Sequence, residues 1–224
     1  MTSIFLRILL FHLAFQVFGC EMGETKSEKQ AIATDKAMQR IGGPCETCEL
    51  MYEKMPQVMD ATDTSAGWQE DGTRLQVKGK MVKSDGSTPA AGVIIYYWQT
   101  DNSGRYTPND NMEGGSTLHG HIRGWLKPDA TGQFTIWTIR PGAYPNSDIE
   151  AHIHVLVKEP GLPNEYYIDD WVFDNDPLLT HAKRKARENR GGNGIQQVSS
   201  TYGLETIEPL IILGKNIPGY PAGR

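Results

Sequence analysis

The sequence predicts an all-β protein, an antiparallel β-sandwich with one short helix after its core strands. From residue 74 onward, short segments rich in β-branched and aromatic residues alternate with segments rich in turn-forming residues. The 24 glycines and 13 prolines among the 224 residues also favour frequent turns over long helices. Residues 41–224 are numerous enough for one domain with a complete hydrophobic core.

Residues 1–20 are predicted to be a signal peptide. Arg7 precedes an apolar run over residues 8–18, which is too short for a membrane-spanning helix but has the length of a signal-peptide core. The run ends in VFGC, which resembles the bacterial lipoprotein cleavage signal, and Cys20 would then be lipidated. An ordinary cleaved signal peptide is the alternative. Both alternatives predict an exported protein, periplasmic or at the cell surface. In the lipoprotein alternative, the lipid on Cys20 would be its only membrane attachment.

Residues 21–40 are polar and are predicted to be a flexible tether that leads into the domain. Cys45 and Cys48 follow in the segment GGPCETCEL. In an exported protein this spacing favours a local disulfide over half of a zinc site, because no second cysteine pair completes such a site. The formal net charge of −5 lacks the basic character of nucleic-acid-binding proteins, so no nucleic-acid partner is expected.

The predicted strands are short apolar segments in which β-branched and aromatic residues predominate. In order, they are 74–82, 93–100, 121–127, 133–139, 151–157, 165–173, 194–200 and 210–214. The sequence PDATG between the third and fourth segments favours a turn, so these two strands are predicted to form a hairpin. The segment DPLLTHAKRKAREN is the predicted helix, with Pro177 in its first turn and basic residues in its second half.

Two loops between these strands each carry a tyrosine. The polar loop 101–116 contains Tyr106, and the proline- and glycine-rich loop 140–148 contains Tyr144. Ordered loops of this length are often functional. Both tyrosines are therefore candidate site residues.

The strand AHIHVLV places His152 and His154 on the same face, because alternate residues of a strand point to the same side. Two adjacent imidazoles are either metal ligands or hydrogen-bonded core histidines. Phenol is a poor ligand for zinc, but a hard trivalent cation binds it as phenolate. Two phenolates from Tyr106 and Tyr144 with two imidazoles would therefore favour Fe³⁺ and leave positions open for a substrate.

The stretches YYWQTDNSGRY, HIRGWLKPDATGQFTIWTIRPGAYP and AHIHVLVKEPG resemble the intradiol ring-cleavage dioxygenases, the family of catechol and protocatechuate dioxygenases. The resemblance extends over roughly residues 74–177. It implies a β-sandwich with non-haem Fe³⁺ bound by Tyr106, Tyr144, His152 and His154. It also implies cleavage of a catechol ring between its hydroxyls with O₂ to a muconate-type diacid. Tyr144 would take a substrate proton and thus be catalytic. Many members dimerise, so a homodimer is possible.

Two positions depart from the family pattern. Ile149 and Glu150 stand where those enzymes usually have Arg-Pro before the histidines, and Asp170 stands near the position of a glutamine. Arg123, in HIRGW, is predicted to supply the missing positive charge and so to be catalytic, with a surface ion pair as the alternative. These two departures affect which substrate is expected and, to a lesser degree, whether the protein turns it over.

Two other functions stay open from the sequence. The first is a non-catalytic exported β-sandwich that acts as a binding module. The second is a copper or zinc protein, because HGHIRG holds a further histidine pair, His119 and His121, that could join His152 and His154. More simply, His119 and His121 orient ligand groups or line the pocket.

Overall fold

The computed structural model describes residues 40–110 and 112–223, which lie in one unit spanning Lys36–Arg224. The predicted signal peptide, the lipidation site at Cys20 and almost all of the tether fall outside the described residues. Within the described residues, no helix has both the length and the apolar character needed to cross a membrane.

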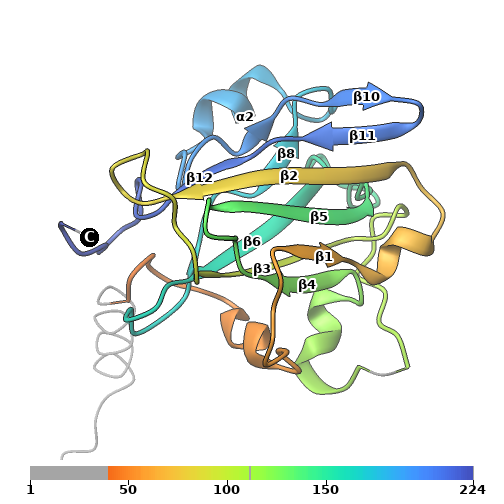
Figure 1. Cartoon of the computed structure of the whole chain (residues 1–224). Helices are drawn as coiled ribbons and strands as arrows, with labels where there is room; N and C mark the ends of the chain where they lie inside the picture. Colours follow the sequence, from red (N-terminus) through yellow and green to blue (C-terminus); the bar gives the residue numbers. More distant parts are fainter. Residues whose placement is uncertain (1–39, 111, 224) are drawn as a thin grey trace, which may run out of the picture. The chain divides into compact units, whose positions relative to one another are not determined.

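Two six-stranded β-sheets form the domain (Figure 1). In the first sheet the order is β1-β5-β2-β11-β10, and β12 also pairs with β2. In the second sheet the order is β4-β3-β6-β8-β9, and β7 also pairs with β6. The strands of the first sheet are β1 (Thr62–Thr64), β2 (Arg74–Val82), β5 (Gln133–Ile139), β10 (Ser199–Thr201), β11 (Leu204–Ile207) and β12 (Leu210–Ile212). Those of the second are β3 (Ile94–Gln99), β4 (Arg123–Leu126), β6 (His152–Lys158), β7 (Tyr166–Tyr167), β8 (Trp171–Phe173) and β9 (Ile195–Gln196).

The hydrophobic core lies between the two sheets. Leu75 and Val77 from β2 belong to the same buried cluster as Ile95 from β3 and Val155 from β6. Phe134 of the first sheet stacks on Trp171 of the second, with ring centroids 6.1 Å apart. Alternate residues of the central strands β2, β3, β5 and β6 supply this core, as the strand period of two requires. The prediction of an all-β sandwich is therefore confirmed.

Strand pairing is mixed rather than antiparallel throughout. The central pairs β2–β5 and β3–β6 are antiparallel, whereas β1–β5, β11–β2, β12–β2 and β8–β9 are parallel. Parallel neighbours arise because the connections between these strands are long and return the chain in the same direction.

The predicted hairpin of 121–127 and 133–139 is wrong. The turn itself forms, since Gly132 N donates to Asp129 O at 2.9 Å. However, β4 pairs with β3 in the second sheet, and β5 pairs with β2 in the first. The turn therefore carries the chain from one sheet to the other, which lets Leu126 and Phe134 both reach the core.

The helix is shorter than predicted and starts later. α2 spans His181–Ala186, and the side chain of Thr180 caps it by accepting from Lys183 N. Pro177 therefore precedes the helix instead of lying in its first turn. Three 3₁₀ helices were not predicted, namely η1 (Cys48–Tyr52), η2 (Ala66–Gln69) and η3 (Gly114–His119). Strands β1 and β11 were also not predicted, because both are short and lack an apolar run.

A second buried cluster lies on the outer face of the second sheet. It joins Tyr96, Trp98 and Leu156 of β3 and β6 to Cys48 and Met51 of η1. Cys45 and Cys48 are joined by a disulfide, which confirms the predicted pairing. The N-terminal part of the domain thus covers the face from which His152 and His154 project.

Candidate metal centre

His152 and His154 lie side by side on β6, as the strand period predicts. Their ring centroids are 4.5 Å apart, and their Nε2 atoms are 3.1 Å apart. β6 lies between β3 and β8, and His154 pairs across the sheet with Trp98. The Trp98 ring stacks on the His154 ring at 4.7 Å, which restricts the orientation of that imidazole.

In both histidines, Nδ1 faces an oxygen atom that can only accept a hydrogen bond. Nδ1 of His152 donates to the backbone oxygen of Glu150 at 2.7 Å, and Nδ1 of His154 donates to Oδ1 of Asp170 at 2.9 Å. Each proton is thereby placed on Nδ1, which leaves the Nε2 lone pair free to bind a metal. Burial lowers the pKa of His152, which keeps this ring neutral.

Asp170 is ionised in this arrangement. Burial of its carboxyl acts to raise the pKa, but the charge of His154 and the hydrogen bond from it outweigh this effect, and the pKa is lowered. A carboxylate behind an imidazole is a recurrent feature of metal sites, where it orients the ring and increases its basicity. Among the described His, Cys, Asp and Glu side chains, those that could share one metal ion are His152, His154 and Asp170.

Tyr106 and Tyr144 complete the group. Oη of Tyr106 is 2.9 Å from Nε2 of His154, and Oη of Tyr144 is 3.1 Å from Nε2 of His152. The two phenolic oxygens are 2.6 Å apart. The structure therefore brings together the donor atoms of all four residues predicted to be metal ligands, although these residues come from two loops and one strand.

Burial raises the pKa of both phenols, and in Tyr106 the hydrogen bond with Tyr144 raises it further. Without a cation each phenol stays protonated and has one proton to donate, Tyr106 to Oη of Tyr144 or Nε2 of His154 and Tyr144 to Nε2 of His152. One strongly charged cation at the centre would replace both protons. The donor set, two buried phenols and two imidazoles with free Nε2 atoms, fits a hard trivalent ion such as Fe³⁺.

The second histidine pair does not join this group. His119 is buried, with Nδ1 2.8 Å from Oη of Tyr96 and Nε2 3.0 Å from Oγ1 of Thr47. Its ring stacks on Trp98 at 4.1 Å, behind His154. His121 contacts the backbone oxygen of Thr107 and the carboxylate of Glu70. This geometry offers no support for a site made of four histidines.

Arg123 lies outside the four-donor group. Its guanidinium donates to Oη of Tyr96 at 3.3 Å and to the backbone oxygen of Glu53 at 3.4 Å, and it covers the ring of Trp125. None of these contacts is with a carboxylate, so they do not form the surface ion pair that was the alternative prediction for Arg123. A catalytic role for Arg123 stays a prediction, since its guanidinium contacts Tyr96, Glu53 and Trp125 and none of the four donors.

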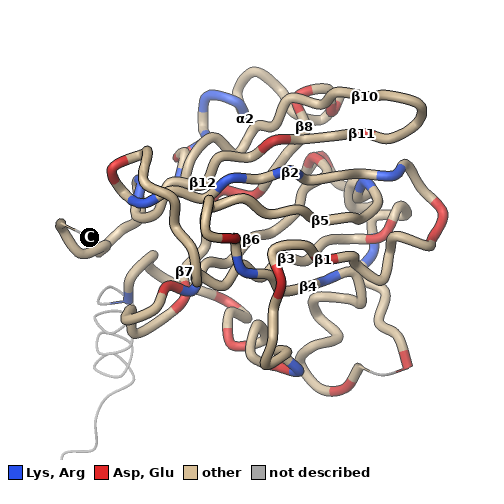
Figure 2. The backbone as a smooth tube through the Cα atoms, in the orientation of Figure 1, with Lys and Arg blue, Asp and Glu red and all other residues tan. Residues whose placement is uncertain are grey.

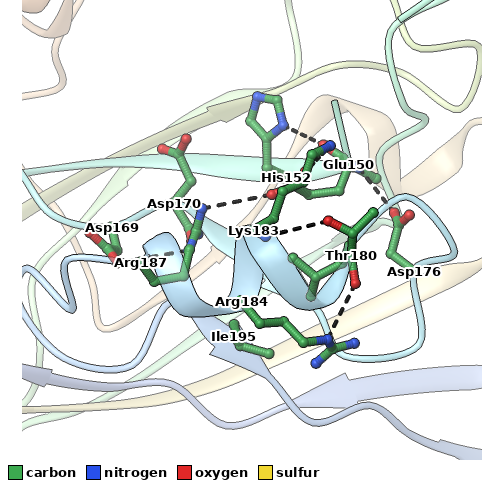
Figure 3. A network of polar contacts seen from close by, with 12 residues as sticks. Glu150, His152, Asp169, Asp170, Asp176, Thr180, Lys183, Arg184, Arg187 and Ile195 are labelled. Atoms are coloured by element: carbon green, nitrogen blue, oxygen red, sulfur yellow. Dashed lines mark hydrogen bonds and ion pairs between the residues drawn. The ribbon is translucent and has the colours of Figure 1, made fainter. Parts of the chain in front are cut away.

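Sequence reasoning missed the network that holds the start of β6 (Figure 3). The carboxylate of Glu150 is buried and pairs with Nζ of Lys183 at 3.0 Å and with Arg187 at 3.8 Å. Figure 2 shows in blue that Lys and Arg residues gather at α2, and Lys183 lies in this helix while Arg187 follows it. The backbone oxygen of the same Glu150 orients His152. The available signals in the sequence were an acidic residue, Glu150, directly before an apolar strand and two cations, Lys183 and Arg187, four positions apart on the predicted helix.

Glu150→Gln should lower the free energy of unfolding by about 2 kcal/mol, because it leaves two partly buried cations without their carboxylate. Chemical denaturation measures this loss. Glu205→Gln, which breaks the pair of Arg140 and Glu205 at 2.9 Å in the other sheet, is the control for loss of an ion pair as such. Only Glu150→Gln should also weaken metal binding. Equal metal affinity in the two variants would contradict the role given to Glu150.

The histidines behind the centre predict a loss of stability in acid. Burial lowers the pKa of His119 to about 3, whereas the unfolded value is about 6.5. As pH falls below the unfolded value, only the unfolded chain takes up this proton, so the stability present at neutral pH is lost at up to about 1.4 kcal/mol per pH unit. His119→Asn should reduce this slope between pH 6.5 and 4 in urea denaturation. His181→Asn, at an exposed position of α2, should leave it unchanged.

Comparison with known proteins places this geometry in a family. The sequence profile of a family described as dioxygenase matches residues 49–190. The chain is 27% identical over 173 residues to the 6-chlorohydroxyquinol 1,2-dioxygenase of Cupriavidus pinatubonensis, covering 68% of this chain and 58% of that protein. It is 29% identical over 173 residues to the chlorocatechol 1,2-dioxygenase of a Pseudomonas species, covering 66% and 62%. The chain thus spans about three fifths of the length of these relatives.

Among solved structures, the 3-chlorocatechol 1,2-dioxygenase of Rhodococcus opacus has the same fold, with a TM-score of 0.57 and 20% identity over 85% of this chain and 78% of that one. The profile match is continuous, covers more than half of the chain and contains all four donor residues. The chain therefore belongs to the intradiol ring-cleavage dioxygenase family.

Proposed function

We propose that this protein is a non-haem Fe³⁺ intradiol dioxygenase. It would cleave a catechol-type ring between its two hydroxyls with O₂ and yield a muconate-type diacid. The observation that carries the proposal is the convergence of Tyr106, Tyr144, His152 and His154, whose donor atoms form a closed set of contacts between 2.6 and 3.1 Å. Similarity to a 6-chlorohydroxyquinol 1,2-dioxygenase and a chlorocatechol 1,2-dioxygenase supports a catechol-type substrate.

Each residue of the centre has a distinct role in this proposal. Bound Fe³⁺ would supply Lewis-acid activation of the catechol. His152 and His154 would remain neutral ligands, held by Glu150 and Asp170. Tyr144 would accept a proton from a substrate hydroxyl, and its raised pKa favours retention of that proton. Trp98 forms a rigid apolar backing to His154 that limits the access of water from behind the ring.

The test combines iron content, colour and oxygen uptake on one purified sample. A protein that holds one Fe³⁺ through tyrosinate should be wine-red, and it should consume O₂ with a catechol. Tyr144→Phe should shift or weaken the charge-transfer band and lower turnover. A red protein that leaves every catechol intact would instead favour a non-catalytic binding module. A colourless protein with one copper or zinc ion would favour the histidine-based alternative and would contradict the proposal.

Iron binding should release two protons, because one cation replaces the protons of Tyr106 and Tyr144, and each histidine binds through Nε2 while its proton stays on Nδ1. The apparent affinity should then rise about 100-fold per pH unit near neutrality, at constant free Fe³⁺. Calorimetry in buffers of different ionisation enthalpy counts the protons directly. Tyr106→Phe should reduce the count to one. Release of no protons would mean that the phenols are not ligands.

The proposal includes export of the protein. The disulfide between Cys45 and Cys48 supports it, because disulfides persist in oxidising compartments. Lipidation at Cys20 is a separate part of this proposal. Mass spectrometry of the mature N-terminus would test it, with Cys20→Ser as the control.

A further inference from the structure

The two tyrosines reach the centre from different loops. Tyr106 lies in the connection that leaves β3 of the second sheet, and Tyr144 lies in the connection from β5 of the first sheet to β6. Neither tyrosine belongs to a strand, yet their phenolic oxygens are 2.6 Å apart. Some feature outside the sheets must therefore set the distance between the two loops.

Asp101 organises the loop of Tyr106 from within. Its Oδ1 accepts from Ser103 N at 2.8 Å, Ser103 Oγ at 2.6 Å and Arg105 N at 3.1 Å. Its Oδ2 accepts from Thr107 Oγ1 at 2.6 Å. The carboxylate therefore binds the residues on both sides of Tyr106. Its backbone closes the turn, since Asp101 N donates to Arg105 O at 2.9 Å.

The same residue also holds the loop of Tyr144. The backbone oxygen of Asp101 accepts from Gly142 N at 2.9 Å, and Thr100 Oγ1 donates to Gly142 O at 2.7 Å. The two loops touch through their backbones, because a Cβ on Gly104 would lie 1.9 Å from Ala143 O. A movement of the Asp101 turn would therefore displace both tyrosines relative to each other.

We infer that Asp101 is a positioning residue that sets the spacing of Tyr106 and Tyr144 and so determines whether both phenols can bind one metal ion. It contacts neither phenol and acts only through the two loops. Burial acts to raise its pKa, but the hydrogen bonds from Ser103 and Thr107 outweigh this and lower the pKa, so the carboxylate keeps all its acceptors. The effect on iron rests on the proposed function, whereas the effect on the tyrosines does not.

The chain contains a matched control for this role. Asp129 makes the same kind of turn, with Oδ1 accepting from Thr131 N at 2.8 Å, Thr131 Oγ1 at 2.7 Å and Gln133 N at 3.0 Å. That turn connects β4 to β5 and carries no residue of the centre. Asp101→Asn and Asp129→Asn therefore remove one carboxylate charge from each of two similar turns, and only the first also removes an acceptor, Oδ2, that holds Thr107 beside Tyr106. Only Asp101→Asn should affect the tyrosines.

The experiment compares both variants of the full chain with and without iron. In metal-free protein labelled with 3-fluorotyrosine, the fluorine resonances of Tyr106 and Tyr144, assigned with their phenylalanine variants, should move in Asp101→Asn and stay in place in Asp129→Asn. In iron-loaded protein, Asp101→Asn should weaken Fe³⁺ binding about tenfold by chelator competition and shift the charge-transfer band. Asp129→Asn should stay within about twofold of the wild type.

Thr107→Val provides a second, milder variant, since it removes only the contact to Oδ2. It should shift the same resonances in the same direction by less. Unmoved tyrosine resonances in a folded Asp101→Asn protein would overturn the inference, as would equal shifts in Asp129→Asn. If the wild type binds no iron, the proposed function fails, but the fluorine comparison still decides the role of Asp101.

Discussion

Asp170→Asn should lower the affinity for Fe³⁺ by about 10- to 100-fold, the usual cost of removing a partner behind a metal-binding histidine. Oδ1 of Asp170 accepts the Nδ1 proton of His154 at 2.9 Å. An asparagine can still accept this proton through its amide oxygen, so the ring keeps its orientation. The negative charge is lost, and His154 becomes a weaker donor to the metal.

The same substitution should change the colour of the iron-loaded protein. A less electron-rich iron is the stronger Lewis acid, so charge transfer from tyrosinate should need less energy and the band should move to longer wavelength. Chelator competition and absorption spectra measure the two effects together.

Asp174→Asn is the matched control for Asp170→Asn, because Asp174 lies on the same segment but its carboxylate accepts from Val198 N, away from the centre. It should leave both the affinity and the band unchanged. Equal affinities in Asp170→Asn and wild type would show that the carboxylate does not act on the metal through His154.

The parts of the site that sequence reasoning predicted depend on local rules. A strand period of two is enough to put His152 and His154 on one face, and the predicted bounds of β2 and β5 coincide with the observed strands. Both tyrosines were identified as candidates because each lies in a long turn-rich loop and because the surrounding motifs resemble a known family. These features can be recognised without knowing how the two sheets pack.

The parts that it missed depend on contacts between distant segments. A turn such as the one at Asp129 has the same local sequence signal whether it closes a hairpin or crosses between sheets, and only the packing of Leu126 and Phe134 decides. Similarly, Asp170 is one of several acidic residues in its segment. Its pairing with His154 follows from the order β6-β8 in the second sheet, which no local pattern contains.

Gly104→Ala should destabilise the protein by about 3 kcal/mol, which combines about 1 kcal/mol for a left-handed backbone with the cost of overpacking. Gly104 is buried and has φ of +79°, and an added Cβ would lie 1.9 Å from the backbone oxygen of Ala143. Because that obstacle is backbone rather than a flexible side chain, the loops of Tyr106 and Tyr144 must separate to accept it. Thermal or urea unfolding measures the stability, and iron titration measures the centre.

Gly203→Ala separates the two causes. Gly203 has nearly the same φ, +80°, but nothing lies within 4 Å of its added Cβ. Gly203→Ala should therefore lower the free energy of unfolding by only about 1 kcal/mol, the cost of the left-handed backbone, and it should bind iron like the wild type. The difference between the two variants isolates the contact between the loops. If Gly104→Ala lost no more stability than Gly203→Ala and still bound iron at full affinity, the two loops could not be in backbone contact, and the spacing of the phenols would need another cause.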